Sequence, residues 1–364
     1  MLNNAKLGKI TLNLNVDGTH RKQQYPHIIM KGLVASIDYS QYAYQNITLD
    51  GEYKHGGFTG KMALEDVNGT IKLNGSINTA EKIPTFDFLA TIDHFRPHEL
   101  HLTSGYENAE FSARLKANFT GGSIDEMNGE INLDSLCYTL PEKTYFLRNF
   151  KVSAINESGK EKSLAIHSNF MTGSIAGDYS YKTLPASILN IVKGYIPALI
   201  DKDSSKDNKR KKKKPVRTDN NFHFDLHLYD TELISVIFNL PLKIYAHSTV
   251  KGYFSDASQR LRVEGYFPRM RYKDNYIESG MFLCENPERQ IRTSLRLTNR
   301  KPKGAVNIAL EAQAQNDSIR TVLNWGNIGN TTYSGSLSTL TRLIREEVPD
   351  SLKRHLAHAP AKTP

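Results

Sequence analysis

The sequence predicts a mainly β protein built from many antiparallel strands, and two observations carry this prediction. Apolar and polar residues alternate with period two along the chain, as in Ile10, Leu12, Leu14 and Val16, which is the pattern of strands with one dry and one wet face. Short turn-rich pieces such as 55–57 and 67–69 separate about 18 such segments at the spacing of hairpins and meanders.

Taken in order, the elements divide the chain into two β sections joined by a helix and a loop. Residues 1–182 and 222–340 carry the alternation. The segment 183–200 predicts an amphipathic helix, with Thr183 as N-cap, Pro185 in the first turn and a kink or end at Pro197. Residues 201–221 are lysine-dense and predict a disordered loop, a short capped helix is expected near 231–239, and 341–364 form a tail.

Glycines recur inside the predicted strands. A Gly stands between polar and apolar strand residues at Gly51, Gly75, Gly177, Gly252 and Gly265. Glycine normally weakens a strand, so its repetition predicts places where the sheet bends sharply or where another group approaches the backbone closely.

Composition and charge exclude some functional classes. The 364 residues, 39% apolar and 23% charged, suffice for one or two sizeable cores. Of the net charge of +9, the run 206–217 holds eight positive and one negative residue, hence +7, which leaves +2 for the rest. A protein that grips nucleic acid spreads its cations over a folded face, so the balance argues against a nucleic-acid enzyme.

The lysine run itself has three interpretations. It predicts first a solvated loop, second a contact of Lys211, Lys212, Lys213 and Lys214 with anionic lipid headgroups, and third a nucleic-acid patch. Base stacking has no support, because no aromatic residue lies within the run.

The sequence has few cysteines and no recognisable targeting segment. Cys137 and Cys284 cannot form a disulfide framework and are expected to be unpaired. No run of about 18 apolar residues occurs and the N-terminus lacks the apolar core of a signal peptide. A strand-like beginning and an unfinished end are typical of a piece of a longer protein.

Catalytic motifs are missing. The sequence has no Gly-rich phosphate loop, nucleophile elbow or Cys-x-x-Cys pair. His94, His98 and His101 would ligate a metal only if Pro97 turned the chain back, and polar positions around a turn are the favoured interpretation. His223 and His227 lie about 13 Å apart on one strand face, too far to share an ion. We therefore expect no catalytic residue, metal or cofactor.

The apolar side of each strand must be buried against another apolar surface. A closed sandwich or barrel hides it against other strands, whereas a long sheet folded lengthwise into a trough hides it against lipid tails. A third class is an enzyme whose site is assembled from dispersed polar residues. The alternation alone is compatible with both sheet arrangements.

A resemblance favours the trough. Several segments resemble the recurring units of the TamB-like translocation and assembly module family, which is part of the AsmA-like superfamily: 44–53, 56–60, 121–131, 323–327 and 332–335. The likeness covers nearly the whole chain apart from the lysine run and the last twenty or so residues, and this chain would be a middle section.

The resemblance implies a long twisted antiparallel sheet folded into an open apolar trough, a β-taco. It also implies a non-enzymatic, membrane-associated periplasmic protein, anchored to the inner membrane through a segment outside this chain. The trough would carry phospholipid between inner and outer membrane, support outer-membrane protein assembly, or do both, with acyl chains and an outer-membrane assembly-type barrel as partners and no nucleic acid. The alternative is a closed scaffold or adhesin module without lipid. The residues expected to line the groove are Leu12, Leu14, Leu73, Leu115, Phe119, Phe224, Leu226, Val263, Leu295 and Ile308.

Overall fold

Strands make up most of the computed structural model, which describes residues 7–19, 25–200, 218–245, 247–288, 290–301, 304–328 and 333–344. The strands are β1 (Leu7–Thr19), β2 (His27–Tyr39), β3 (Tyr42–Lys54), β4 (Gly57–Asp66), β5 (Gly69–Asn78), β6 (Thr85–Phe95), β7 (Glu110–Thr120), β8 (Asn128–Thr139), β9 (Thr144–Ile155), β10 (Ser163–His167), β11 (Met171–Asp178), β12 (Asn221–Leu228), β13 (Leu242–Ile244), β14 (Ser248–Ser255), β15 (Arg260–Tyr272), β16 (Asn275–Glu285), β17 (Ile291–Lys301), β18 (Gly304–Gln315), β19 (Ser318–Ile328) and β20 (Ser334–Arg342).

Helical segments occur at the two places that the sequence indicates. The first is α1 (Leu184–Tyr195), which follows Thr183 and stops at Ile196, and α2 (Pro197–Ile200) continues after the break that Pro197 predicts. The second is α3 (Glu232–Ile237), which follows Thr231. Thr183 does not cap α1 with its side chain; its hydroxyl instead accepts a hydrogen bond from Asn220 Nδ2 (3.0 Å).

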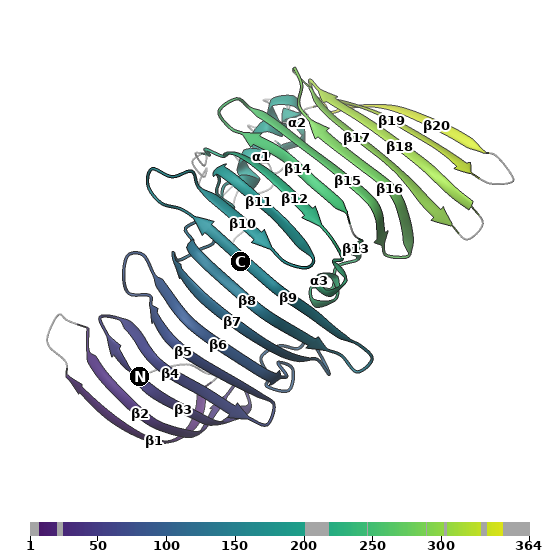
Figure 1. The fold of residues 1–364 in the computed structure, drawn as a ribbon. Helices are drawn as coiled ribbons and strands as arrows, with labels where there is room; N and C mark the ends of the chain where they lie inside the picture. Colours follow the sequence, from purple (N-terminus) through teal and green to yellow (C-terminus); the bar gives the residue numbers. More distant parts are fainter. Residues whose placement is uncertain are drawn as a thin grey trace, which may run out of the picture.

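All the strands belong to one open antiparallel sheet, and the predicted fold class is thereby confirmed (Figure 1). Each strand pairs with the next in chain order up to β12, which pairs with β14, and the pairing then continues to β20. The short β13 lies against the far end of β15. The two predicted β sections are therefore joined directly, because β11 pairs with β12.

The alternation is kept through several local irregularities. At Asn46, Asn149 and Ser279 the backbone has a φ of 54°, 54° and 55°, a left-handed conformation that Asn adopts more readily than most residues. On either side of such a point, successive apolar side chains that face the core are three residues apart instead of two. Buried Leu147 and half-buried Phe150 on β9 are an example. Such irregularities bend a strand, and here they keep the apolar side chains on one side of the sheet.

The connections between strands form two rims, named here rim A and rim B. Of the described residues, rim A carries the connections 40–41, 67–68, 96–109, 140–143, 168–170, 229–245, 247 and 273–274, whereas rim B carries 55–56, 79–84, 121–127, 156–162, 179–200, 218–220, 256–259, 286–288, 290 and 316–317. α3 lies on rim A, and α1 and α2 lie on rim B, so the helices stand at opposite ends of the strands (Figure 1).

Two clusters of buried apolar side chains lie under these helices. The rim B cluster joins Ile191 of α1 to sheet residues including Ala154, Leu164 and Phe222. The rim A cluster joins Leu233 of α3 to Ala109, Tyr138, Leu147 and Phe170. Both helices therefore pack on the same apolar face of the sheet, one from each rim.

Candidate functional site: the apolar face of the sheet

The apolar face contains one row of register partners, without a polar member, that runs from β1 to β20. The members of this row, called here the central row, are hydrogen-bond register partners from strand to strand, and every one is apolar or Gly. They are Val16, Met30, Gly51, Gly60, Gly75, Phe88, Ala117, Ile131, Val152, Ile166, Gly173, Leu226, Val250, Gly265, Phe282, Leu295, Leu310, Leu323 and Leu337. At about 4.8 Å per strand the row is on the order of 85 Å long.

The structure places all ten predicted groove residues on this face. Leu226 and Leu295 are members of the central row. Leu14, Leu73 and Leu115 share the neighbouring row with Gly32, Leu49, Met62 and Ala90. Phe119, Phe224 and Val263 share the row on the other side. Ile308 pairs with Leu297 in the row next to the central row, whereas Leu12 lies one row further out on the edge strand β1 and is 54% exposed.

Sequence reasoning missed most members of the central row. Met30, Ile131, Val152 and Leu310 carry the same alternating pattern as the predicted residues. Nothing in a single strand shows which alternating residue meets which on the next strand, because register depends on turn length and on the irregularities within strands. Only the strand pairing brings these residues into one line.

The strand glycines mark close approach between neighbouring strands, as expected. Gly75 pairs with Phe88, and a Cβ at Gly75 would lie 2.2 Å from the Asp87 carbonyl oxygen. A Cβ at Gly252 would lie 2.0 Å from the Arg262 carbonyl oxygen and 3.1 Å from the Phe224 ring. A side chain does not fit at these positions, because the backbone of the adjacent strand approaches closely, and at Gly252 the Phe224 ring lies against it as well.

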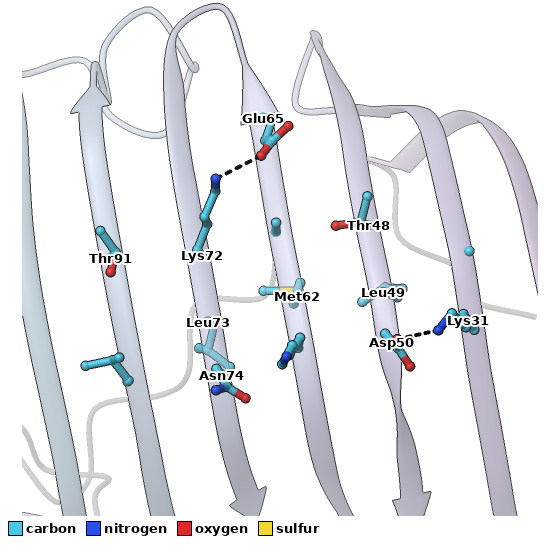
Figure 2. Close-up of a pocket in the computed structure, with 14 residues that line it drawn as sticks. Lys31, Thr48, Leu49, Asp50, Met62, Glu65, Lys72, Leu73, Asn74 and Thr91 are labelled. Atoms are coloured by element: carbon cyan, nitrogen blue, oxygen red, sulfur yellow. Dashed lines mark hydrogen bonds and ion pairs between the residues drawn. The ribbon is translucent and has the colours of Figure 1, made fainter.

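The opposite, polar face is lined by ion pairs between adjacent strands. Lys31 contacts Asp50 at 2.8 Å and Lys72 contacts Glu65 at 3.1 Å. A hollow of about 620 Å³ opens on this side of β2 to β6, and Figure 2 shows both pairs at its wall. Its charged groups are exposed, and four of the five form these two pairs, which is the pattern of a solvated sheet surface.

α1 is held on rim B by a buried hydrogen-bond network. Fully buried Ser187 donates to Asp256 Oδ2 (2.8 Å), and Asn220, 1% exposed, donates through Nδ2 to Ser187 Oγ (2.7 Å) and through its backbone N to Asp256 Oδ2 (2.7 Å). Further along, the amide of Ala198 donates to Asp317 Oδ1 (2.7 Å). α1 and α2 therefore extend along rim B as far as the β18–β19 turn.

Asp125, in the β7–β8 turn, fixes the segment that precedes α1. It accepts hydrogen bonds from the amides of Tyr181 (2.7 Å) and Lys182 (3.3 Å) and from Ser180 Oγ (3.0 Å). Burial by itself raises the pKa of Asp125, but these hydrogen bonds outweigh it and lower the pKa below its ordinary value. The carboxylate form therefore stabilises this part of rim B.

α3 is held on rim A by two hydrogen bonds of buried side chains to β13 and by partly exposed contacts to neighbouring connections. Ser235 Oγ donates to the Leu242 carbonyl oxygen (2.6 Å), and the Ile244 amide donates to Thr231 Oγ1 (2.9 Å). Glu232 contacts Lys143 at 2.7 Å and Lys243 at 3.3 Å, and all three side chains are about a third or more exposed. The hydrogen bond from Lys143 lowers the pKa of Glu232. Tyr106, from the β6–β7 connection, donates its hydroxyl to the Ile237 carbonyl oxygen (3.0 Å). The β6–β7 connection and α3 therefore form one continuous cover on rim A.

The remaining candidates from the sequence are dispersed. His98 contacts Glu99 at 3.4 Å and His227 contacts Asp225 at 3.3 Å; among the described residues no group of three or more His, Cys, Asp or Glu side chains is placed to hold a metal ion. Cys137 and Cys284 are free thiols. Lys211, Lys212, Lys213 and Lys214 lie outside the described residues.

No described helix is both long and apolar enough to cross a membrane. Comparison of the chain with protein-family models, with curated proteins and with solved structures gave no match.

Proposed function

We propose that this protein is a non-enzymatic component of a Gram-negative cell envelope whose apolar face carries phospholipid acyl chains between the inner and the outer membrane. The single observation that supports the proposal most strongly is the central row, which contains no polar side chain on any strand that it crosses. The resemblance to the TamB-like family supports the same function and a periplasmic location.

The energetics of such a surface are favourable for an acyl chain. A chain of about 16 carbons loses on the order of 12 kcal/mol when it leaves an apolar environment for water, at about 0.8 kcal/mol per CH₂. Along the central row the chain would exchange one apolar contact for the next without full exposure. The transfer therefore requires a continuous apolar surface and no reactive group.

Other parts of the sequence-based prediction extend this proposal. Anchoring to the inner membrane and contact with an outer-membrane assembly-type barrel would involve segments outside this chain. Contact of Lys211 to Lys214 with anionic headgroups would hold the protein near a membrane surface, at about 1 kcal/mol per basic residue. Support of outer-membrane protein assembly is implied by the resemblance alone.

The test is lipid content. We expect purified protein to retain phospholipid, measured by mass spectrometry of an organic extract. Leu73→Asp should reduce the phospholipid recovered per protein several-fold, because a carboxylate in the apolar face repels acyl chains. The matched control is Asn74→Asp, which adds the same group one residue away on the polar face, between the neighbouring strands β4 and β6.

Equal loss of lipid in Leu73→Asp and Asn74→Asp would contradict the assignment of the apolar face. A stable, monomeric and lipid-free wild-type protein would overturn the proposed function and favour the scaffold alternative. Leu226→Asp repeats the test on the central row in the second half of the sheet, with His227→Asp as its control on the opposite face.

A further inference from the structure

The sheet is narrowest from β10 to β14, a part called here the waist. β10 has 5 residues, and β11, β12 and β14 have 8 each, whereas β9 has 12 and β15 has 13. The connections at the two ends of this narrow part are those that carry the helices: α1 and α2 follow β11 on rim B, and α3 follows β12 on rim A. Because these strands are short, each helical connection can fold over the apolar face from its own rim; the two connections are called here the covers.

The two covers meet across the width of the apolar face. Ile131 and Val152 pack against the rim B cluster that contains Ile191 of α1. Leu133 and Phe150, each two residues nearer to rim A on β8 and β9, pack against the rim A cluster that contains Leu233 of α3. Neighbouring positions on the same two strands therefore belong to different covers.

The central row passes beneath this joint cover. Ile131, Val152 and Ile166 are consecutive members of the row, and all three pack against the rim B cluster. Phe88 and Phe282 are members of the same row on either side, and neither belongs to one of the two clusters. An acyl chain on the row thus meets protein side chains at the waist that it does not meet in the flanks.

We infer that α1 and α3 form a septum that divides the apolar face into two chambers, β1 to β7 and β15 to β20, and that an acyl chain passes between them only when α3 leaves the sheet. This inference rests on the proposed function. α3 is the movable part because it has 6 residues and its contacts with neighbouring connections, through Glu232 with Lys143 and through Tyr106, are partly exposed, where water and salt weaken ion pairs. The hydrogen bonds of the buried Thr231 and Ser235 side chains join it only to β13 of the same connection. α1 is held by the buried Ser187, Asn220 and Asp256 network.

The experiment uses a photo-crosslinking aromatic residue, p-benzoylphenylalanine, in place of single phenylalanines of the full chain. Phe88 and Phe282 report on the two chambers, Phe150 on the space under α3 and Phe224 on the space under α1. The protein is incubated with vesicles of phosphatidylethanolamine and phosphatidylglycerol that carry tritiated acyl chains, and is then irradiated. We expect strong labelling at Phe88 and Phe282, and at least fivefold weaker labelling at Phe150 and Phe224.

Glu232→Gln removes the ion pairs of α3 and should raise labelling at Phe150 about threefold, with Phe224 unchanged. Tyr106→Phe removes the hydroxyl that bonds to the end of α3 and should act in the same direction. Glu264→Gln is the matched control, because Glu264 also contacts two cations, Lys251 at 3.1 Å and Arg262 at 2.9 Å, away from both covers; it should change nothing. Cooperative unfolding of each variant shows that it is folded.

The outcomes separate the two proposals. Labelling at Phe150 and Phe224 as strong as at Phe88 in the wild-type protein would overturn the septum and leave lipid binding intact. An increase at Phe224 instead of Phe150 in Glu232→Gln would overturn the assignment of α3 as the movable part. No labelling at any of the four positions would overturn lipid binding, and the septum with it.

Discussion

The N-terminal and C-terminal parts of the sheet present the same apolar face but cover it from opposite rims. In β1 to β7 the cover is the β6–β7 connection on rim A, where fully buried Leu100 accepts a hydrogen bond from Tyr44 through its carbonyl oxygen (2.7 Å), and the described turns on rim B are short. In β15 to β20 the cover is α1 and α2 on rim B, and the described turn on rim A, 273–274, is short.

This difference shows how an open sheet can bury part of a long apolar face without closing into a barrel. A barrel closes on itself and a sandwich adds a second sheet, but here segments inserted at the rims cover part of the face and leave the rest accessible. Where both rims contribute, at β8 to β14, buried side chains of both clusters pack on the face. The following predictions test this division between a covered waist and open flanks, beginning with the largest expected effect.

Leu164→Asp should be the most damaging change. Leu164 is 6% exposed in the waist cluster under α1, so the variant buries an unpaired carboxylate and should lose about 4 kcal/mol or more of unfolding free energy. The same change at Leu73, in an open flank, should cost about 1 to 2 kcal/mol. Urea unfolding followed by circular dichroism measures both; equal losses would mean that waist and flank are packed alike.

Asn220→Ala should destabilise the protein by about 2 to 3 kcal/mol, because it removes the buried hydrogen bonds that its side chain makes in the rim B network. The Ser180 amide, which donates to Oδ1 (2.7 Å), loses its acceptor, and the Ser187 hydroxyl loses the bond that it accepts from Nδ2 but keeps its own to Asp256. Asn74→Ala, at an exposed position of the polar face, should change the unfolding free energy by less than about 0.5 kcal/mol. Similar values for both variants would contradict the role of the rim B network.

The lowered pKa of Asp125 predicts that the unfolding free energy of the protein depends on pH. Because its pKa is lowered in the folded protein, its contribution to stability is complete above the pKa of the unfolded chain, about 3.9, and is lost as the pH falls through the lower folded value. Asp125→Asn should lower the unfolding free energy near neutral pH by about 2 kcal/mol and flatten its fall in acid. Thermal unfolding between pH 6 and pH 3 measures this, and parallel pH profiles would contradict it.

Deletion of 206–217 should have the smallest effect. The run carries +7 of the net charge of +9 but lies outside the strand segments, so the unfolding free energy should change by less than about 0.5 kcal/mol and the lipid content should stay the same. A large loss of either quantity would show that this charge acts on the sheet or on its lipid.

Much of the architecture was predictable because it is written in local patterns. Period-two alternation predicts the strands, Thr183 and Pro197 predict the beginning and the break of the first helix, and the Asp230–Thr231–Glu232 segment predicts the second. Side-chain direction in a strand and the cost of Pro inside a helix are properties of the nearest few residues. The choice of an open sheet was not local, and before the strand pairing was known it depended on the resemblance.

The sequence by itself determined that each strand has one dry side, and thereby which residues belong to the apolar face. Only the tertiary structure decided that those residues align into one row from Val16 to Leu337, because register depends on irregularities such as that at Asn149 and on every turn along the chain. It also decided where the helices lie. The amphipathic pattern of 184–200 predicts a helix that needs an apolar partner surface. The buried cluster around Ile191 contains residues of the β7–β8 turn, β9, β10, β12 and β14, and only the pairing of these strands brings the residues together.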